Sequence, residues 1–350
     1  MAARPEAAAP PVRQWYRDPL SCLQTTLATL LLRAGEDPLG ALGLAWEFVY
    51  PPGEVHAVEY YWPCRHPGDL ARSVLPHHSV TSAWRRAGDA DPLGELERAL
   101  ERGVLPIAAV DNFHLPFRPA YQDVHAAHLV VVYDVDRGRG EVGVSDVMPP
   151  DHLGPVAAAD FLRAWYSPMP HDEQDAFFSG SPTAGGRWLE VHMRTPFPAL
   201  TPGRLAAALR ADSALLTGPD DDGGLRGLRR YTAELVERAE TGDGDAVGRV
   251  YTFGWAPQAQ ASLHGELLRR QGAAWGLPDL AEAGRRVEGV AHAWTSLRVA
   301  GAHGRRRPRA CAPQLKRHAA RLDRRYHEAV EAVGLAIDAL QPEAMGAVDG

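Results

Sequence analysis

The sequence has little cysteine and no long hydrophobic run. It contains three cysteines, Cys22, Cys64 and Cys311, among 350 residues. This number is too small for a disulfide framework and is typical of a reducing compartment. No uninterrupted apolar stretch is long enough to cross a bilayer, and the first residues lack the apolar core of a signal peptide. We therefore expect a cytoplasmic protein that does not bind membranes.

Other absences exclude further classes of function. The net charge of −7 argues against a general nucleic-acid binder. No glycine-rich loop follows a predicted strand with the lysine that a phosphate-binding loop needs. The pairs His125/His128, Cys64/His66 and His77/His78 do not have the spacing of zinc ligands. We expect no metal and no cofactor.

The length exceeds that at which single cores usually stop growing, which favours two domains. Residues 1–12 form an Ala/Pro-rich, flexible lead-in. Up to Pro198, helices predicted at 92–103 and 160–166 alternate with strands predicted at 46–50, 57–62, 104–110, 129–135, 141–147 and 188–193. After Pro198 only helices are predicted, at 201–216, 225–240, 258–275, 278–300 and 313–340. We therefore predict an α+β domain over residues 13–198 and a helical domain over 199–345.

The stretch from Asp18 to Gly35 predicts the best-defined helix. Asp18 suits the N-cap, Pro19 suits the first turn, and Gly35 suits a left-handed exit. Cys22 then lies in the first turns, where free amide groups and the helix dipole favour a thiolate. The sequence thus indicates a nucleophile, although an unpaired cysteine is also common as a small buried hydrophobe.

A predicted hairpin supplies the partners that such a nucleophile needs. His128 precedes the strand at 129–135, and Asp146 lies at the end of the returning strand at 141–147. In an antiparallel hairpin these two positions lie on neighbouring strands at the same end. We predict Cys22 as the nucleophile, His128 as the base and Asp146 as the group that orients the imidazole. A core histidine with a turn aspartate is the alternative, and His125 is a second candidate base.

Two further segments are candidates for binding. The segment from 111 to 125 predicts a loop that lines a cleft, with candidate substrate contacts at Asp111, Phe113, Phe117 and Tyr121; a packed surface loop is the alternative. A basic run near the C-terminus favours a solvated helix face, or else a surface that attracts an acidic partner, and contains Arg305, Arg306, Arg307, Lys316 and Arg317.

The order Cys, His, Asp is the arrangement of papain-like cysteine enzymes. The sequence resembles in particular the butirosin biosynthesis protein H acyltransferase family, in the stretches 21–31, 42–50, 110–121, 125–133, 144–147, 263–269 and 293–294. The resemblance implies a papain-like domain with an antiparallel sheet and an N-terminal nucleophile helix, followed by a helical domain. It also implies that the backbone N–H of Cys22 and one side-chain donor, for which we choose Gln14, hold the oxyanion.

The resemblance further implies an activity. The family moves an acyl or aminoacyl group from a carrier-protein thioester, through a cysteine acyl-enzyme, to an amine in natural-product biosynthesis. The basic residues would then bind an acidic acyl carrier protein. Trp46 and Glu47 stand where we expect small glycines and are candidate substrate contacts. The alternatives are a hydrolase, thioesterase or thioester-releasing cyclase with the same triad, and a non-catalytic binding protein.

Overall fold

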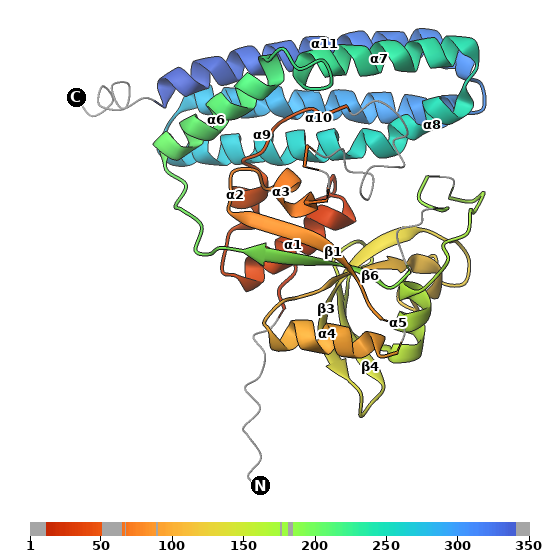
Figure 1. Cartoon of the computed structure of the whole chain (residues 1–350). Coiled ribbons are helices and arrows are strands. Elements are labelled where there is room, and N and C mark those ends of the chain that lie inside the picture. The colour runs from red at the N-terminus through yellow and green to blue at the C-terminus, as the bar shows by residue number, and fades with distance from the viewer. Residues whose placement is uncertain are drawn as a thin grey trace.

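A computed structural model describes residues 12–340 except 51–64, 67, 89, 176 and 181–184. Within these residues, a six-stranded sheet with short helices around it is followed by a layer of long helices (Figure 1). The protein is therefore α+β with a helical C-terminal part. The predicted lead-in and the predicted strand at 57–62 lie outside the described residues.

The sheet is antiparallel throughout, in the order β1-β6-β2-β3-β4-β5. Its strands are β1 (Val80–Arg86), β2 (Ile107–Asp111), β3 (Ala127–Asp136), β4 (Glu141–Asp146), β5 (His152–Ala157) and β6 (Arg187–Met193). The four inner strands were predicted, and the two edge strands β1 and β5 were missed. Edge strands need no continuous apolar pattern, and β5 contains Gly154 and Pro155, which weaken a strand signal.

Helices cover both faces of the sheet. On one face, α4 (Pro92–Glu101) lies against β3 and α5 (Ala158–Trp165) lies against β2, with Phe161 and Trp165 in the same core as Val130 and Val132. On the other face, α1 (Cys22–Arg33) lies against β3, near α2 (Pro38–Leu42) and α3 (Leu70–Val74). Period-2 alternation in β3 explains this arrangement, because Leu129 and Val131 point to the second face. The sheet therefore holds α1 at a fixed place.

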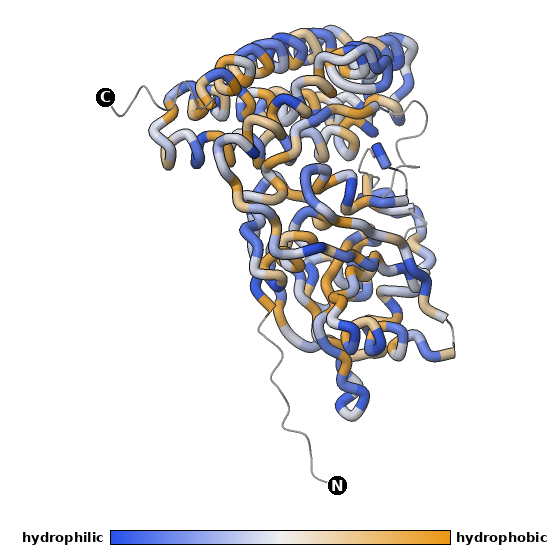
Figure 2. The backbone as a smooth tube through the Cα atoms, turned by 60° about the vertical axis from the view of Figure 1, so that its left-hand side comes forward, coloured by the Kyte–Doolittle hydropathy of each residue, from blue (hydrophilic) through white to orange (hydrophobic). Residues whose placement is uncertain are grey.

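The helical layer begins shortly after β6 and comprises α6 (Pro202–Thr217), α7 (Gly224–Thr241), α8 (Gly244–Phe253), α9 (Trp255–Trp275), α10 (Pro278–Gly304) and α11 (Pro308–Ala339). Only α8 was missed, since its first half is rich in glycine. Hydrophilic residues predominate along the outer edge of this layer (Figure 2). None of the described helices is both long and apolar enough to cross a bilayer.

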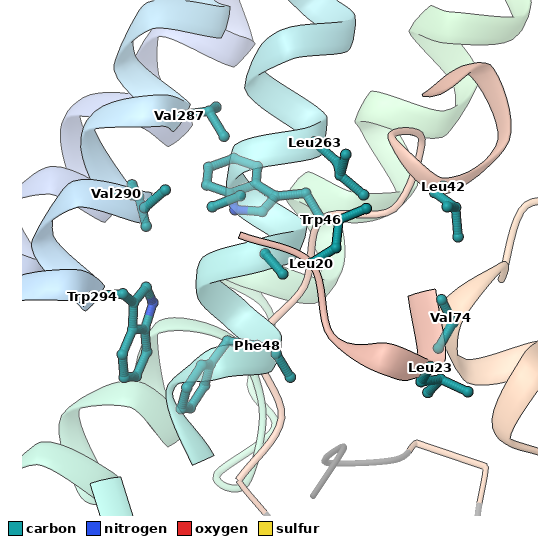
Figure 3. Packing of buried hydrophobic residues seen from close by; sticks show 14 of the residues in the cluster. Leu20, Leu23, Leu42, Trp46, Phe48, Val74, Leu263, Val287, Val290 and Trp294 are labelled. Atoms are coloured by element: carbon teal, nitrogen blue, oxygen red, sulfur yellow. The ribbon is translucent and has the colours of Figure 1, made fainter. Parts of the chain in front are cut away.

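The segment after α2 corrects two predictions. Residues 46–50 were predicted as a strand, but they form only an isolated bridge, Val49 to Gly223. Trp46 was predicted to contact substrate, yet it is 1% exposed and stacks between His264 and Tyr326. Figure 3 shows it among Leu263, Val287 and Val290 of the helical layer. The segment is an extended anchor that joins the two layers through aromatic packing.

Candidate active site

Cys22 is the first residue of α1. Ser21 caps the helix by accepting a hydrogen bond from the Gln24 amide, and the Gln24 side chain accepts one from the Ser21 amide. This capping box starts the helix at Cys22, later than the predicted cap at Asp18. The thiol therefore lies at the positive end of the helix dipole, beside first-turn amides that have no partner within the helix. The exit matches the prediction, because Gly35 has φ +82°.

His128 and Asp146 lie together on β3 and β4. The pairing of Val131 with Ser145 places Asp146 opposite Val130, so that the His128 and Asp146 side chains meet diagonally on one face. The distance from His128 Nε2 to Asp146 Oδ2 is 2.8 Å. The other ring nitrogen, Nδ1, remains for the hydrogen bond between His128 and the side chain of Cys22. The three predicted residues are thus brought together in one chain of contacts.

The environment of His128 favours its charged form. Burial by itself lowers the pKa of His128, but the Asp146 carboxylate and the hydrogen bond to Cys22 outweigh it and raise this pKa to about 9. Burial by itself raises the pKa of the Asp146 carboxyl. His128 and Arg118 lower this pKa by more, so that it lies below its ordinary value. An imidazolium beside the sulfur stabilises a thiolate, which is the nucleophilic form of cysteine.

Arg118 is a part of the site that the sequence did not indicate. Its Nη1 lies 3.1 Å from Asp146 Oδ2 and donates to the Met148 carbonyl at 2.9 Å. The Met148 amide in turn donates to Asp146 Oδ1 at 3.0 Å. Both oxygens of Asp146 are therefore occupied, which fixes the plane of the carboxylate behind His128. Arg118 also lines the pocket described next.

A pocket opens over Cys22 and His128, with an empty volume of about 790 Å³ that is partly open to solvent. Its wall is built by both layers of the molecule. The sheet layer contributes polar groups at Asn112, Arg118 and Asp175, together with Met148 and Phe178, and the helical layer contributes Thr252, Trp255 and Ala256. Most of this lining could not be foreseen, since it comes from loops and from the distant α8–α9 junction.

Two predicted site residues lie elsewhere than expected. The amide of Gln14 donates to Ser145 Oγ, to the Asp146 carbonyl and, at 2.8 Å, to the His152 carbonyl. Gln14 thus braces the β4–β5 edge and does not line the pocket. His125 Nδ1 lies 2.7 Å from Asp111 Oδ2, and Ser167 Oγ donates to the same oxygen at 2.6 Å. His125 is engaged in this second pair, so His128 is the imidazole that faces the sulfur.

Four other predicted substrate contacts have partners within the protein. Phe113 stacks on His125, and Phe117 stacks on His152 with ring centroids 4.0 Å apart. The Tyr121 hydroxyl accepts a hydrogen bond from Gln122, and Glu47 forms an ion pair with Arg65 at 2.8 Å. None of these side chains lines the pocket. Within the same loop, Asn112 and Arg118 line the pocket.

Two remaining predictions concern metal and charge. Among the residues that the structure describes, no three His, Cys, Asp or Glu side chains are grouped to hold a metal ion. The predicted basic run spans the turn between α10 and α11 and the first half of α11. Arg306, Arg307, Lys316 and Arg317 are exposed there, and Arg305 is half-buried near Asp245.

Comparison with known proteins identifies one part of the chain. Residues 21–147 match the family described as butirosin biosynthesis protein H, N-terminal. The match begins at the N-cap of α1 and ends just after Asp146, so it contains all three residues of the Cys22, His128 and Asp146 constellation. No curated protein matches the chain. Residues 21–147 of the chain are therefore similar to the family described as butirosin biosynthesis protein H, N-terminal.

Proposed function

We propose that the protein is a cysteine acyltransferase with a papain-like triad, which transfers an acyl or aminoacyl group from a carrier-protein thioester to an amine. The observation that carries this proposal is the contact chain from the Cys22 sulfur through His128 to Asp146, at the floor of a pocket. The family match supports an enzyme of biosynthesis. The reaction follows from what these groups can do.

Acylation begins with the Cys22 thiolate attacking the carbonyl carbon of the thioester. A bond forms between this carbon and the Cys22 sulfur, and the bond to the donor sulfur breaks. The His128 imidazolium gives its proton to the departing thiolate, so that a neutral thiol leaves. His128 is then neutral and ready to act as a base, while Asp146 keeps its ring in place.

The oxyanion of this step needs two hydrogen-bond donors. One is the backbone N–H of Cys22, because first-turn amides point out of the helix end. For the other we infer Asn112, which alone carries a side-chain amide among the described residues that line the pocket. Asn112 replaces Gln14 in this role. Removal of such a donor typically raises the barrier by about 2.7–4 kcal/mol.

Transfer requires an amine near the acyl-enzyme. The amine nitrogen attacks the carbonyl carbon, neutral His128 takes its proton, and the Cys22 thiolate leaves. Asp175 is a suitable anchor for a cationic acceptor, since it is a carboxylate in the pocket wall. Its Oδ1 accepts the amides of Phe177 and Phe178, which leaves Oδ2 for a ligand.

The carrier protein is the partner that we propose for the basic surface. Acyl carrier proteins are acidic, and Arg305, Arg306, Arg307, Lys316 and Arg317 form a basic surface on the helical layer. Charges of opposite sign would raise the rate at which the two proteins meet, and added salt would lower it.

The test is the intact mass of the protein after mixing with acyl-loaded carrier protein. We expect a mass increase equal to the acyl group, which is lost in Cys22→Ala. Cys311→Ala is the matched control, because Cys311 is a buried cysteine in α11, far along the chain, and its loss should leave the adduct unchanged. An adduct that persists in Cys22→Ala would contradict the proposal.

Addition of amines separates transfer from the alternatives. Faster loss of the adduct with appearance of an amide supports the acyltransferase. Loss at a rate that no amine changes, with release of the free acid or a cyclic product, would make the protein a hydrolase, thioesterase or cyclase. Cys22 that reacts with neither thioester nor iodoacetamide near neutral pH would make it a binding protein.

A further inference from the structure

A second groove joins the catalytic pocket at Thr252. Thr252 lines both hollows, and the second groove continues between the segment around His171 and Gly180 and the α8 helix. Its other walls include Arg249 and Arg305. Because Arg249 lies three residues before Thr252 on α8, it is only about 4.5 Å further along the helix axis. The two hollows therefore lie next to each other on α8, with Thr252 between them.

The groove has an excess of positive charge. Arg249 and Arg305 face it, and their only carboxylate neighbour among its described lining residues is Asp245. The Asp245 side chain is 81% exposed, and its nearest contact with Arg305 is a long 3.9 Å. Water screens such a pair strongly, so both guanidinium groups keep most of their capacity for another anion. Guanidinium groups bind phosphate through parallel N–H donors.

Glycine residues place Arg305 in the groove. The stem of Arg305 lies across Gly248 of α8, where an added Cβ would stand 3.0 Å from the Arg305 Cδ. His171 and Gly180 also line the groove. The close approach at Gly248 gives Arg305 a defined position, unlike the exposed Arg306 and Arg317.

We propose that Arg249 and Arg305 bind the phosphate of the donor's thiol arm, so that the groove holds a phosphopantetheine arm whose thioester reaches Cys22. This inference rests on the proposed acyl transfer and adds the part of the donor that the enzyme recognises. Two sources carry this arm, an acyl carrier protein and coenzyme A. The surface residues Arg306, Arg307, Lys316 and Arg317 would contact the carrier protein itself, outside the groove.

The experiment compares two small donors that differ only in the phosphate, acyl-pantetheine and acyl-4′-phosphopantetheine. The measured quantity is kcat/KM for formation of the acyl-enzyme. We expect the phosphorylated donor to be preferred about tenfold or more, as for a charged hydrogen-bonded contact. Arg249→Ala and Arg305→Ala should remove this preference and leave kcat/KM for acyl-pantetheine unchanged. Arg317→Ala, on the exposed face of α11, is the matched control and should keep the preference.

Gly248→Ala gives an independent variant that keeps both arginines. Its added methyl group displaces Arg305, so we expect the phosphate preference to fall while acyl-pantetheine reacts as before. Equal use of both donors by the wild-type protein, or a preference that survives loss of either arginine, would overturn the groove assignment. Absence of any acyl-enzyme with either donor would instead overturn the proposed function. The source of the arm is identified by comparing acyl-loaded carrier protein with acyl-coenzyme A as donors. Arg249→Ala should lower kcat/KM for whichever donor places its arm in the groove. If Arg249→Ala lowers kcat/KM for neither donor, the groove assignment is overturned.

Discussion

Replacement of Asp146 by asparagine removes the charge that opposes the burial of His128. In the wild-type protein the pKa of His128 is raised from 6.5 to about 9, mainly by Asp146 acting against burial. This difference corresponds to about 3 kcal/mol in favour of the imidazolium, or to a ratio of charged to neutral rings that is about 300-fold higher. With a neutral amide at position 146, burial dominates. We expect the pKa of His128 to fall to 6.5 or below.

The assay is a pH titration of the histidine ring signals by NMR in protein labelled at histidine. His128→Gln assigns the resonance among the 15 histidines. Asp111→Asn is the matched control, because Asp111 forms the neighbouring His–Asp pair, with His125, at 2.7 Å. It should leave the His128 midpoint near 9. Alkylation of Cys22 at pH 7.5 should be slower in Asp146→Asn and unchanged in Asp111→Asn.

Two results would refute this reasoning. A His128 midpoint near 6.5 in the wild-type protein would mean that Asp146 does not compensate for burial. A midpoint near 9 in Asp146→Asn would mean that the carboxylate is not the source of the raised pKa. Either result would mean that Asp146 does not control the pKa of His128, even though their side chains are in contact.

Three further predictions concern the pH dependence of stability, the buried Trp46 and the pocket carboxylate Asp175. Because the folded-state pKa of His128 lies above its unfolded value, its contribution to stability is complete below pH 6.5 and is lost as the pH rises through about 9. Urea unfolding should show that the free energy of unfolding falls by up to about 3 kcal/mol over this range, and His128→Gln should not show this fall. Trp46→Ala should lower the free energy of unfolding by about 3–5 kcal/mol, because it empties a fully buried aromatic site, and the same urea titration measures it. Asp175→Asn should raise KM for the amine acceptor without changing the rate of acyl-enzyme formation, as measured by steady-state and single-turnover kinetics.

The sequence predicts the inner sheet and the His–Asp pair for the same reason. β3 carries the apolar run 129–132 and returns through a glycine turn into β4, so its pairing is local and the hairpin alone brings His128 towards Asp146. The docking of α1 is also indicated, because its leucines need an apolar face. The sequence does not specify the edge strands of the sheet. It also does not specify the role of Trp46, because an aromatic residue in a sequence can either pack in a core or contact a ligand.

Arg118 and Trp255 illustrate why the rest of the pocket was not predicted. Arg118 lies in an irregular loop, where no periodic pattern indicates which side chain turns inward. Trp255 donates to the Pro19 carbonyl at 2.9 Å across 236 positions of the chain, and this contact depends on how the helical layer packs on the sheet layer. Contacts of this kind arise only in the folded molecule, because no local sequence pattern around either residue indicates the other as its partner.

Part of the pocket wall lies outside residues 21–147, including Thr252, Trp255 and Ala256 of the helical layer. Trp255 lines the pocket and donates to the carbonyl of Pro19, three residues before Cys22; under the proposed function, it would position both Cys22 and the acyl group. It is itself held by Arg298 of α10, whose guanidinium lies over the Trp255 ring and donates to the Tyr251 carbonyl at 2.7 Å. Residues 21–147 thus contain the three groups of the proposed triad, whereas the helical layer contributes one wall of the pocket beside them. A change of acyl specificity is therefore expected from substitutions in α8 and α9, with the triad left intact.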